Sequence, residues 1–346
     1  MINDVIRKVK FSDLNVDDPF FDSLKKDYDF KKWFLSKQNE DVYVFVDDNS
    51  LNGFLYLKDE NEEDSTITPK FDSRRRLKIG TFKINAHGTV LGQRFLSIAL
   101  QKMIEDGHDF TYVTVYRKQK PLIELFEKFG FQFWGSKDNG ELVYYKDKSF
   151  FNDIYKDYPR ISLQHNKFLL SIYPEFHTRM FPNSKLHTET NHVVEDLSFT
   201  NTIEKIYLTK MSGIPNMKVG DIVTIYRTRD NNAPSAEYSS VATSICTVAD
   251  VKNLSDFSGI EEFLMYCGKG SIFSEQELRI YFNTRQFPFI IKMLYNFSLP
   301  KRIIRQCLIN EVGLNRTDYF GFLNLSDIQF KNIVEIGEVY EGFIVN

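Results

Sequence analysis

Apolar and polar residues alternate in several short runs along the first 150 residues. The runs "DVYVFVDD" and "NGFLYLKD" are joined by turn residues, which predicts a β-hairpin. The run "RRRLKIGTFKI" (74–84) predicts a further strand, and "FTYVTVY" (110–116) has the β-branched and aromatic residues typical of strands. A closing hairpin is predicted where "FQFWG" and "ELVYY" flank the turn "SKDNG".

Two stretches between these strands have helical periodicity. Apolar residues recur at helical spacing from Leu91 to Ile104, and Gly107 ends the pattern. Pro121 is suited to the first turn of a second helix, "PLIELFEKFG", which Gly130 ends. This order of strands and helices predicts an α/β domain over residues 1–148, with a mixed sheet flanked by helices.

The second half of the chain follows a different pattern. Short strand-like runs, "IEKIYLT", "DIVTIYRT" and "YSSVATSICTVADV", alternate with helical stretches, "SEQELRIYF", "PKRIIRQCLI" and "SDIQFKNIVEIG". We therefore expect a second, α+β domain over residues 190–346, built on a small β-barrel or sheet. Residues 149–189 are too aromatic for a free linker, so we expect them to connect the domains and pack onto one of them.

Composition is consistent with two cores and limits the partners. The 346 residues are 42% hydrophobic and 15% aromatic, which is enough to fill two domains. Residues 1–150 carry 24 basic and 25 acidic side chains and the remainder carries 20 and 22, so bulk charge does not favour nucleic acid and only a local patch could bind it. The absence of a long apolar run or a signal-peptide core predicts a cytoplasmic protein without a membrane partner.

Several common catalytic and metal-binding patterns are missing. Cys246, Cys267 and Cys307 have no ligand or disulfide spacing, so we expect buried thiols and no metal site. The chain has no HExxH, GxSxG or GxxxxGK[ST] motif. His177 lies among aromatic residues in "YPEFHTRMFP", which favours a structural histidine.

The stretch "KINAHGTVLGQRFL" (83–96) joins a strand to a helix through a turn that contains Gly88 and Gly92. Such a turn directs several backbone N–H groups at one point, and the start of the helix adds partial positive charge. That point suits a phosphate group. An ordinary strand-to-helix connection is the alternative.

As a unit, "HGTVLGQRFL" resembles the R/Q-x-x-G-x-G/A loop of the GCN5-related N-acetyltransferases (GNATs), and "TVYRKQKPLIELFEKFGF" resembles their later strand and helix. The resemblance covers residues 40–147. It implies that the loop holds the pyrophosphate of acetyl-CoA and that the end of the strand pairs with the pantetheine arm. Two positions depart from the motif, because His87 replaces Arg or Gln and Val90 replaces the first glycine. The cofactor-binding residues it implies are Phe82, Ile84, His87, Gly88, Leu91, Gly92, Gln93 and Gln119.

Acetyl transfer to an amine needs a base for the amine proton and an acid for the departing thiolate. Members of the GNAT family often use a tyrosine as the acid, and Phe126 occupies that position here. We expect Tyr116, at the end of its strand, to be the acid; Tyr144 and Tyr145 on the closing hairpin are alternatives. The sequence singles out no base, and proton transfer through water stays open.

The run "MKVGDIVTIYRTRD" followed by "EYSSVATSICTV" resembles the PUA and ASCH-like barrels, which are associated with RNA binding. Residues 279–310 contain no acidic residue and interleave cations with aromatic side chains, a mixture that offers RNA both charge and stacking faces. We expect Lys301, Arg302 and Arg305 to share one face of a helix and to bind RNA. Alternatively, the aromatic residues form a core and the cations are merely solvated.

Three functions remain open at this stage. The first is an acetyl-CoA-dependent N-acetyltransferase whose acceptor is tRNA or aminoacyl-tRNA, presented by the PUA-like domain. The second is an RNA-binding regulator with a degenerate acetyltransferase domain. The third is an acetyltransferase for a small amine or a protein.

Overall fold

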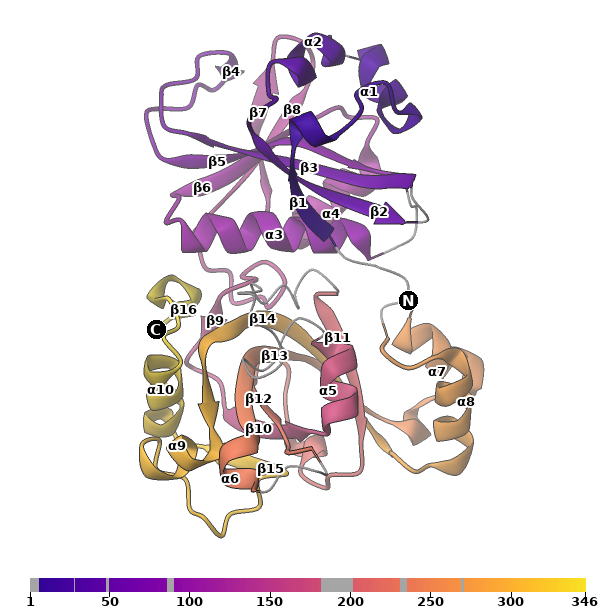
Figure 1. The fold of residues 1–346 in the computed structure, drawn as a ribbon, viewed down its shortest axis with the longest axis vertical. Coiled ribbons are helices and arrows are strands. Elements are labelled where there is room, and N and C mark those ends of the chain that lie inside the picture. The colour runs from indigo at the N-terminus through magenta and orange to yellow at the C-terminus, as the bar shows by residue number, and fades with distance from the viewer. Residues whose placement is uncertain are drawn as a thin grey trace. The chain divides into compact units, whose positions relative to one another are not determined.

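The computed structural model describes residues 6–27, 29–47, 50–85, 90–181, 202–230, 235–268 and 271–346. The chain divides into two compact units, residues 1–149 and 150–346 (Figure 1). Each unit has its own sheet and its own hydrophobic core.

The first unit is built on an eight-stranded sheet with the order β1-β2-β3-β5-β6-β8-β7-β4. Its strands are β1 (Ile6–Lys10), β2 (Asp41–Asp47), β3 (Ser50–Glu60), β4 (Ile67–Thr68), β5 (Arg76–Ile84), β6 (Phe110–Val115), β7 (Gln132–Lys137) and β8 (Leu142–Asp147). Its helices are α1 (Asp22–Asp27), α2 (Phe30–Leu35), α3 (Leu91–Glu105) and α4 (Lys120–Lys128). The β5–β6 pair is parallel and the other neighbours are antiparallel, so the predicted mixed α/β sheet is confirmed.

Side chains on successive strand residues point to opposite faces of this sheet, so each strand offers side chains to both faces. Helices cover both of these faces. On one face, Val44 and Phe54 pack with buried phenyl rings from the segment that contains α1 and α2. On the other face, the guanidinium of Arg94 from α3 lies 5.1 Å from the ring centroid of Phe45. The α3 helix extends along this second face in Figure 1.

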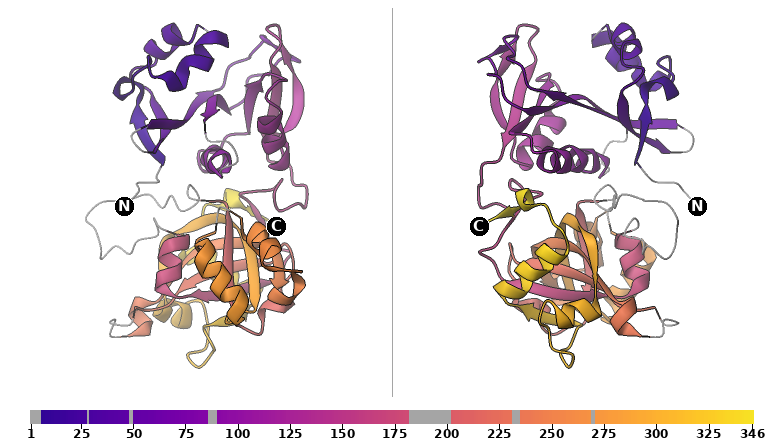
Figure 2. Two further views of the ribbon diagram at one scale, coloured as in Figure 1. Left: turned by 90° about the vertical axis from the view of Figure 1, so that its right-hand side faces the viewer. Right: turned by 60° about the vertical axis from the view of Figure 1, so that its left-hand side comes forward.

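The parallel strands β5 and β6 diverge part of the way along their length. Their register runs from Arg76↔Phe110 to Ile79↔Val113 and ends there, although β5 continues to Ile84. Figure 2 shows the strands of this sheet fanning apart. At the point of divergence Gly80 interrupts the register with β3, and a Cβ there would lie 2.7 Å from the Tyr56 ring. Glycine therefore allows the bulge that turns β5 away from β6.

The second unit contains a six-stranded sheet with the order β11-β14-β13-β12-β10-β15 and the small pair β16-β9. Its strands are β9 (Ile161–Ser162), β10 (Lys167–Ile172), β11 (Glu204–Thr209), β12 (Ile222–Arg227), β13 (Val241–Asn253), β14 (Phe289–Ile304), β15 (Phe322–Leu325) and β16 (Ile344–Val345). Its helices are α5 (Pro174–Met180), α6 (Ala236–Ser239), α7 (Ile260–Cys267), α8 (Glu275–Thr284), α9 (Arg305–Asn310) and α10 (Asp327–Ile336).

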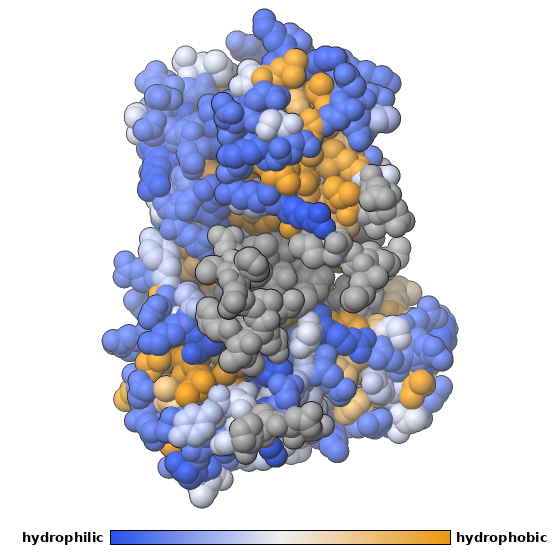
Figure 3. Space-filling view, in the orientation of Figure 1, coloured by the Kyte–Doolittle hydropathy of each residue, from blue (hydrophilic) through white to orange (hydrophobic). Residues whose placement is uncertain are grey.

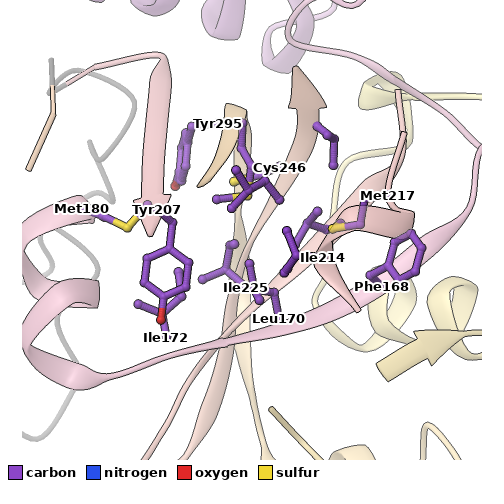
Figure 4. Close-up of a cluster of buried hydrophobic side chains, with 14 of the residues drawn as sticks. Phe168, Leu170, Ile172, Met180, Tyr207, Ile214, Met217, Ile225, Cys246 and Tyr295 are labelled. Atoms are coloured by element: carbon purple, nitrogen blue, oxygen red, sulfur yellow. The ribbon is translucent and has the colours of Figure 1, made fainter. Parts of the chain in front are cut away.

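The six strands wrap around an apolar core that includes Leu170, Ile225 and Cys246 (Figure 4). A smaller core lies under α7 and α8, which are inserted between β13 and β14. The α+β content expected from the sequence is present. Among the described residues β11 and β15 are the ends of the strand order and do not pair, so no closed barrel is formed by these strands.

Two local expectations can be compared with the structure. Part of segment 149–189, which we expected to connect the domains and pack onto one of them, supplies β9, β10 and α5 to the second unit, where β10 is an inner strand between β12 and β15. The stretch "PKRIIRQCLI" is not one helix: its first residues end β14, and α9 begins only at Arg305. Pairing of Ile303 with Ala242 and of Ile304 with Val241 extends the strand and overrides the helical pattern.

Among the described residues, the helices are all too short or too polar to cross a membrane. On the face seen in Figure 3, hydrophilic residues predominate and hydrophobic residues form separate patches in each unit.

Candidate active site

A cavity of about 830 Å³ lies in the first unit, next to the divergence of β5 and β6. Its wall is made by the end of β5, the start of α3, the segment between β6 and α4, α4 itself, the α1–α2 segment and the β7–β8 hairpin. Cavities of this size are typical of small-molecule sites. The divergence creates the space because beyond Ile79 β6 no longer covers that edge of β5.

The cavity brings together five residues that we predicted from distant parts of the sequence. They are Phe82, Ile84, Gly92, Tyr116 and Gln119. Leu91 and Gln93 do not line the cavity; Leu91 is buried, and the amide oxygen of Gln93 is buried without a hydrogen bond among the described residues. His87 and Gly88 lie outside the described residues.

The first turn of α3 faces the cavity through Gly92. The helix begins at Leu91 after Val90, so its first backbone N–H groups have no partners within the helix. A Cβ at position 92 would lie 3.0 Å from Cδ2 of Leu125, a residue that also lines the cavity. The absence of a side chain therefore leaves room beside the helix start.

Tyr116 and Gln119 belong to the segment that links β6 to α4. The backbone N–H of Tyr116 donates to Oε1 of Gln119 at 3.3 Å, and the Gln119 N–H donates to the Tyr116 carbonyl at 2.9 Å. Tyr116 is partly buried, and the ammonium of Lys118 lies 5.3 Å from the centroid of its ring. These contacts give the segment a compact turn that directs both side chains to the cavity wall.

Phe126, at the position of the family's acid, and the alternative acids Tyr144 and Tyr145 do not line the cavity. Phe126 is fully buried, and its ring centroid lies 5.6 Å from that of Phe82 and 4.8 Å from that of Phe131. Neither Tyr144 nor Tyr145 lines the cavity. Burial, followed by the charge of Glu127, raises the pKa of Tyr144.

The segment containing α1 and α2 closes another part of the cavity with Ser23, Leu24, Asp29, Phe30 and Trp33. The ammonium of Lys83 donates to the Ser23 hydroxyl and lies 5.0 Å from the ring centroid of Phe20. Burial lowers the pKa of Lys83, and nearby Asp22 partly offsets that effect. This wall combines flat apolar rings with a few polar groups, as ligand sites commonly do.

Sequence reasoning missed Glu141, which lines the cavity although its side chain belongs to the closing hairpin. It is only 5% exposed, which is unusual for a glutamate. The available signal was its position at the start of "ELVYY", the strand that pairs with β6.

The three cations predicted to bind RNA do not share one helix face. Lys301 and Arg302 lie near the end of β14, where the register with β13 is interrupted between Ser298 and Ile303, and Arg305 begins α9. Lys301 lies 3.6 Å from the carboxylate of Glu338, and the Arg305 guanidinium lies 4.0 Å from the ring centroid of Phe320.

His177 has the structural environment expected from the sequence. It is 1% exposed, and its Nε2 lies 3.0 Å from the Thr243 hydroxyl. Burial, followed by the positive charges of Arg227, Arg302 and Lys205, lowers the pKa of His177 to about 3. The ring is therefore neutral at physiological pH.

One group in the described part of the chain has the spacing of a metal site: Asp59, Asp106 and His108, with ligand atoms within 4.8 Å of one another. His108 Nε2 lies 2.6 Å from an Asp59 oxygen, and Lys102 contacts Asp106. These pairings account for the cluster without an ion, and none of the three residues lines the cavity.

Comparison with known proteins finds structural similarity only. No family model matches the chain, and no curated protein matches it. A chain of the NatC complex bound to Gag peptide and CoA is 17% identical, with a TM-score of 0.28, covering 40% of this chain and 95% of that one. A GNAT-family acetyltransferase from Listeria monocytogenes is 15% identical, with a TM-score of 0.29 and coverage of 41% and 94%. An ASCH protein from Zymomonas mobilis is 12% identical, with a TM-score of 0.31 and coverage of 49% and 95%. Similarities at these TM-scores assign no activity to this chain.

Proposed function

We propose that the first unit is an acetyl-CoA-dependent N-acetyltransferase. The observation that carries the proposal is the cavity at the divergence of β5 and β6, because it gathers Phe82, Ile84, Gly92, Tyr116 and Gln119. Four of these residues are in the cofactor-binding set and the fifth is the expected acid. The motif resemblance and the cavity are independent observations, since the resemblance rests on the sequence alone.

The chain's own groups suit each part of such a cosubstrate. The β6-facing edge of residues 80–84 in β5 has no strand partner among the described residues, so its backbone groups can pair with an extended amide-containing arm. The start of α3 offers N–H groups and partial positive charge to phosphates. Tyr116 supplies a hydroxyl on the cavity wall that can protonate a departing thiolate.

The finer proposal is that the acceptor is an amine carried by RNA, tRNA or aminoacyl-tRNA, held by the second unit. Its support is the resemblance of that unit to PUA and ASCH-like modules. The predicted cation patch does not form one helix face, because Lys301 and Arg302 lie in β14 and Arg305 begins α9. The two alternatives are an RNA-binding regulator that does not transfer acetyl groups, and an enzyme acting on a small amine or a protein.

One experiment separates these functions. The purified full chain is incubated with isotopically labelled acetyl-CoA and total cellular RNA and protein, and the products are analysed by mass spectrometry, while calorimetry measures acetyl-CoA binding. Label in RNA supports the leading proposal, and label only in protein or small amines supports the third function. Binding without any transfer or thiol release supports the regulator, and absence of binding refutes the acetyltransferase proposal.

A further inference from the structure

Glu141 is a buried carboxylate on the wall of the cavity described above. Removing a carboxylate from water is costly, so a glutamate that is 5% exposed calls for a function or a partner. Asp29 is the other acidic residue of the wall, and it is exposed in the turn before α2. Glu141 is therefore the acidic residue that the cavity wall holds away from bulk water.

Glu141 and Tyr116 are the residues just beyond the last pair of the β6–β8 ladder. The antiparallel ladder runs from Phe110↔Asp147 to Val115↔Leu142. One further step of the same register would bring position 116 opposite position 141. Cβ atoms of directly opposed residues are about 4.5–5.5 Å apart and lie on the same face, and both side chains line the cavity.

Hydrogen bonds in the β7–β8 hairpin fix the orientation of Glu141. The Asn139 amide donates from Nδ2 to Oε2 of Glu141 at 3.0 Å, and the Glu141 N–H donates to Oδ1 of Asn139 at 3.2 Å. The N–H of Lys137 donates to the Glu141 carbonyl at 2.9 Å. One carboxylate oxygen is thus held by Asn139, which positions the group on the cavity wall.

We propose that Glu141 is the general base of acetyl transfer, an inference that rests on the proposed function. The Glu141 carboxylate takes a proton from the acceptor amine as the nitrogen lone pair forms a bond to the acetyl carbon. The bond between that carbon and sulfur breaks, the electron pair leaves with sulfur, and the Tyr116 hydroxyl supplies the proton that makes the free thiol. Transfer of a proton from Glu141 to the Tyr116 oxygen, through water, restores both groups.

The test compares the full-length chain with its Glu141→Gln variant, which keeps the size and removes the charge. Thiol release from acetyl-CoA is measured alone and with total cellular RNA, spermidine or an unblocked peptide as the acceptor, across a pH series, and calorimetry measures acetyl-CoA affinity. We expect kcat to fall about 10²- to 10⁴-fold, acetyl-CoA affinity to change little, and the rise of rate with pH that reports the base to disappear. The other titratable groups on this wall are Asp29, Lys83, Tyr116 and Lys118.

The matched control is Glu124→Gln, which removes the same charge from an exposed position of α4 outside the cavity. We expect this variant to keep both the rate and the pH profile of the parent. Equal turnover of Glu141→Gln and the parent would overturn the role of Glu141 and leave the proposed function standing. A parent chain that binds acetyl-CoA but releases no thiol under any of these conditions would overturn both the role of Glu141 and the proposed function. A Glu141→Gln variant that loses affinity and rate together would make Glu141 a binding residue instead of the base.

Discussion

The residues predicted to bind a cosubstrate and those predicted to bind RNA behave in opposite ways in the structure. The first set comes from positions 82 to 119, and four of its members line one cavity together with the expected acid, Tyr116. The second set lies within five consecutive positions, 301–305, and its members are divided between the end of β14 and the start of α9 instead of sharing one helix face. Residues that are close in sequence share a face only if they form the predicted secondary structure, here one helix. Strand register, in contrast, brings residues that are distant in sequence together.

Among substitutions in the cavity, replacement of Tyr116 by phenylalanine is expected to have the largest effect on turnover. Loss of a positioned general acid typically lowers the rate about 10²- to 10⁴-fold. The ring and its packing against Lys118 are kept, so acetyl-CoA affinity should stay near that of the parent. Steady-state thiol release gives kcat, and calorimetry gives the affinity.

Tyr145→Phe is the matched control for this change, because Tyr145 lies on β8 outside the cavity and packs against Trp134 with ring centroids 5.1 Å apart. Its turnover should equal that of the parent. Full activity in Tyr116→Phe would remove Tyr116 from the mechanism and show that gathering in one cavity does not identify the acid.

Gly92→Glu tests whether the start of α3 faces a phosphate. The new side chain would compete for space with Leu125 and place a negative charge at the helix start. We expect acetyl-CoA affinity to fall at least about 100-fold, roughly 2.7 kcal/mol, as measured by calorimetry. Gly92→Ala, which adds only a Cβ 3.0 Å from Leu125 Cδ2, should lose about tenfold or less.

Circular dichroism and thermal unfolding verify that both variants are folded. Unchanged affinity in a folded Gly92→Glu chain would show that the anion, if one binds, lies elsewhere, and the cavity would lose its link to the loop motif.

Much of the first unit was predictable because its periodic signals are strong. The strands 41–47, 50–60 and 76–84 and the helices 91–105 and 120–128 agree with the sequence patterns. The cavity itself was not predictable, because it depends on the point where β5 and β6 stop pairing. No local sequence pattern indicates that point. Glu141 was missed for the same reason, since its place on the same cavity wall as Tyr116 follows from a ladder between distant segments.

The second unit was harder to predict because long-range strand pairing overrides local propensity there. The 16-residue β14 contains stretches that look helical in isolation, yet it pairs with β11 on one side and β13 on the other. Tertiary pairing of this kind commonly decides the state of ambiguous apolar segments.

The pH dependence of stability tests whether His177, which is buried in the second unit, has a structural role. Its pKa is about 3 in the folded chain, because of burial and then the charges of Arg227, Arg302 and Lys205, and about 6.5 when unfolded. Between those values the unfolded chain binds a proton that the folded chain does not. The free energy of unfolding should therefore fall as pH drops from 6.5 towards 3, by about 1.4 kcal/mol per pH unit from this group.

Urea unfolding of the parent and of His177→Gln at pH 7, 5 and 4 measures this contribution, because glutamine does not titrate. We expect the variant to be less stable at pH 7 and to lose less stability on acidification than the parent. Parallel pH dependence in the two proteins would mean that His177 is protonated in the fold, and the structural assignment would be wrong.

The smallest effects are expected at the three cations of the second unit, and they decide whether that unit belongs to RNA biology. Each phosphate contact adds about 0.7 to the salt slope for a single strand, so three contacts would give a slope near 2. Because Lys301 lies near Glu338 and Arg305 lies over Phe320, these cations have internal partners that compete with RNA. We therefore expect Lys301→Gln, Arg302→Gln and Arg305→Gln each to lower the slope by about 0.7 or less.

Gel-shift titrations of a short single-stranded RNA at several salt concentrations measure these slopes, with Lys331→Gln as the control. Lys331 is an exposed cation of α10 in the same unit and outside the predicted set, so its removal tests whether any surface charge has the same effect. A decrease confined to the three predicted positions would mean that cations at the end of β14 and the start of α9 contact one RNA. Equal decreases for all four variants would indicate nonspecific attraction. If the parent binds no RNA even at low salt, the RNA-linked acceptor is refuted, and a small amine or a protein becomes the acceptor that the cavity must accommodate.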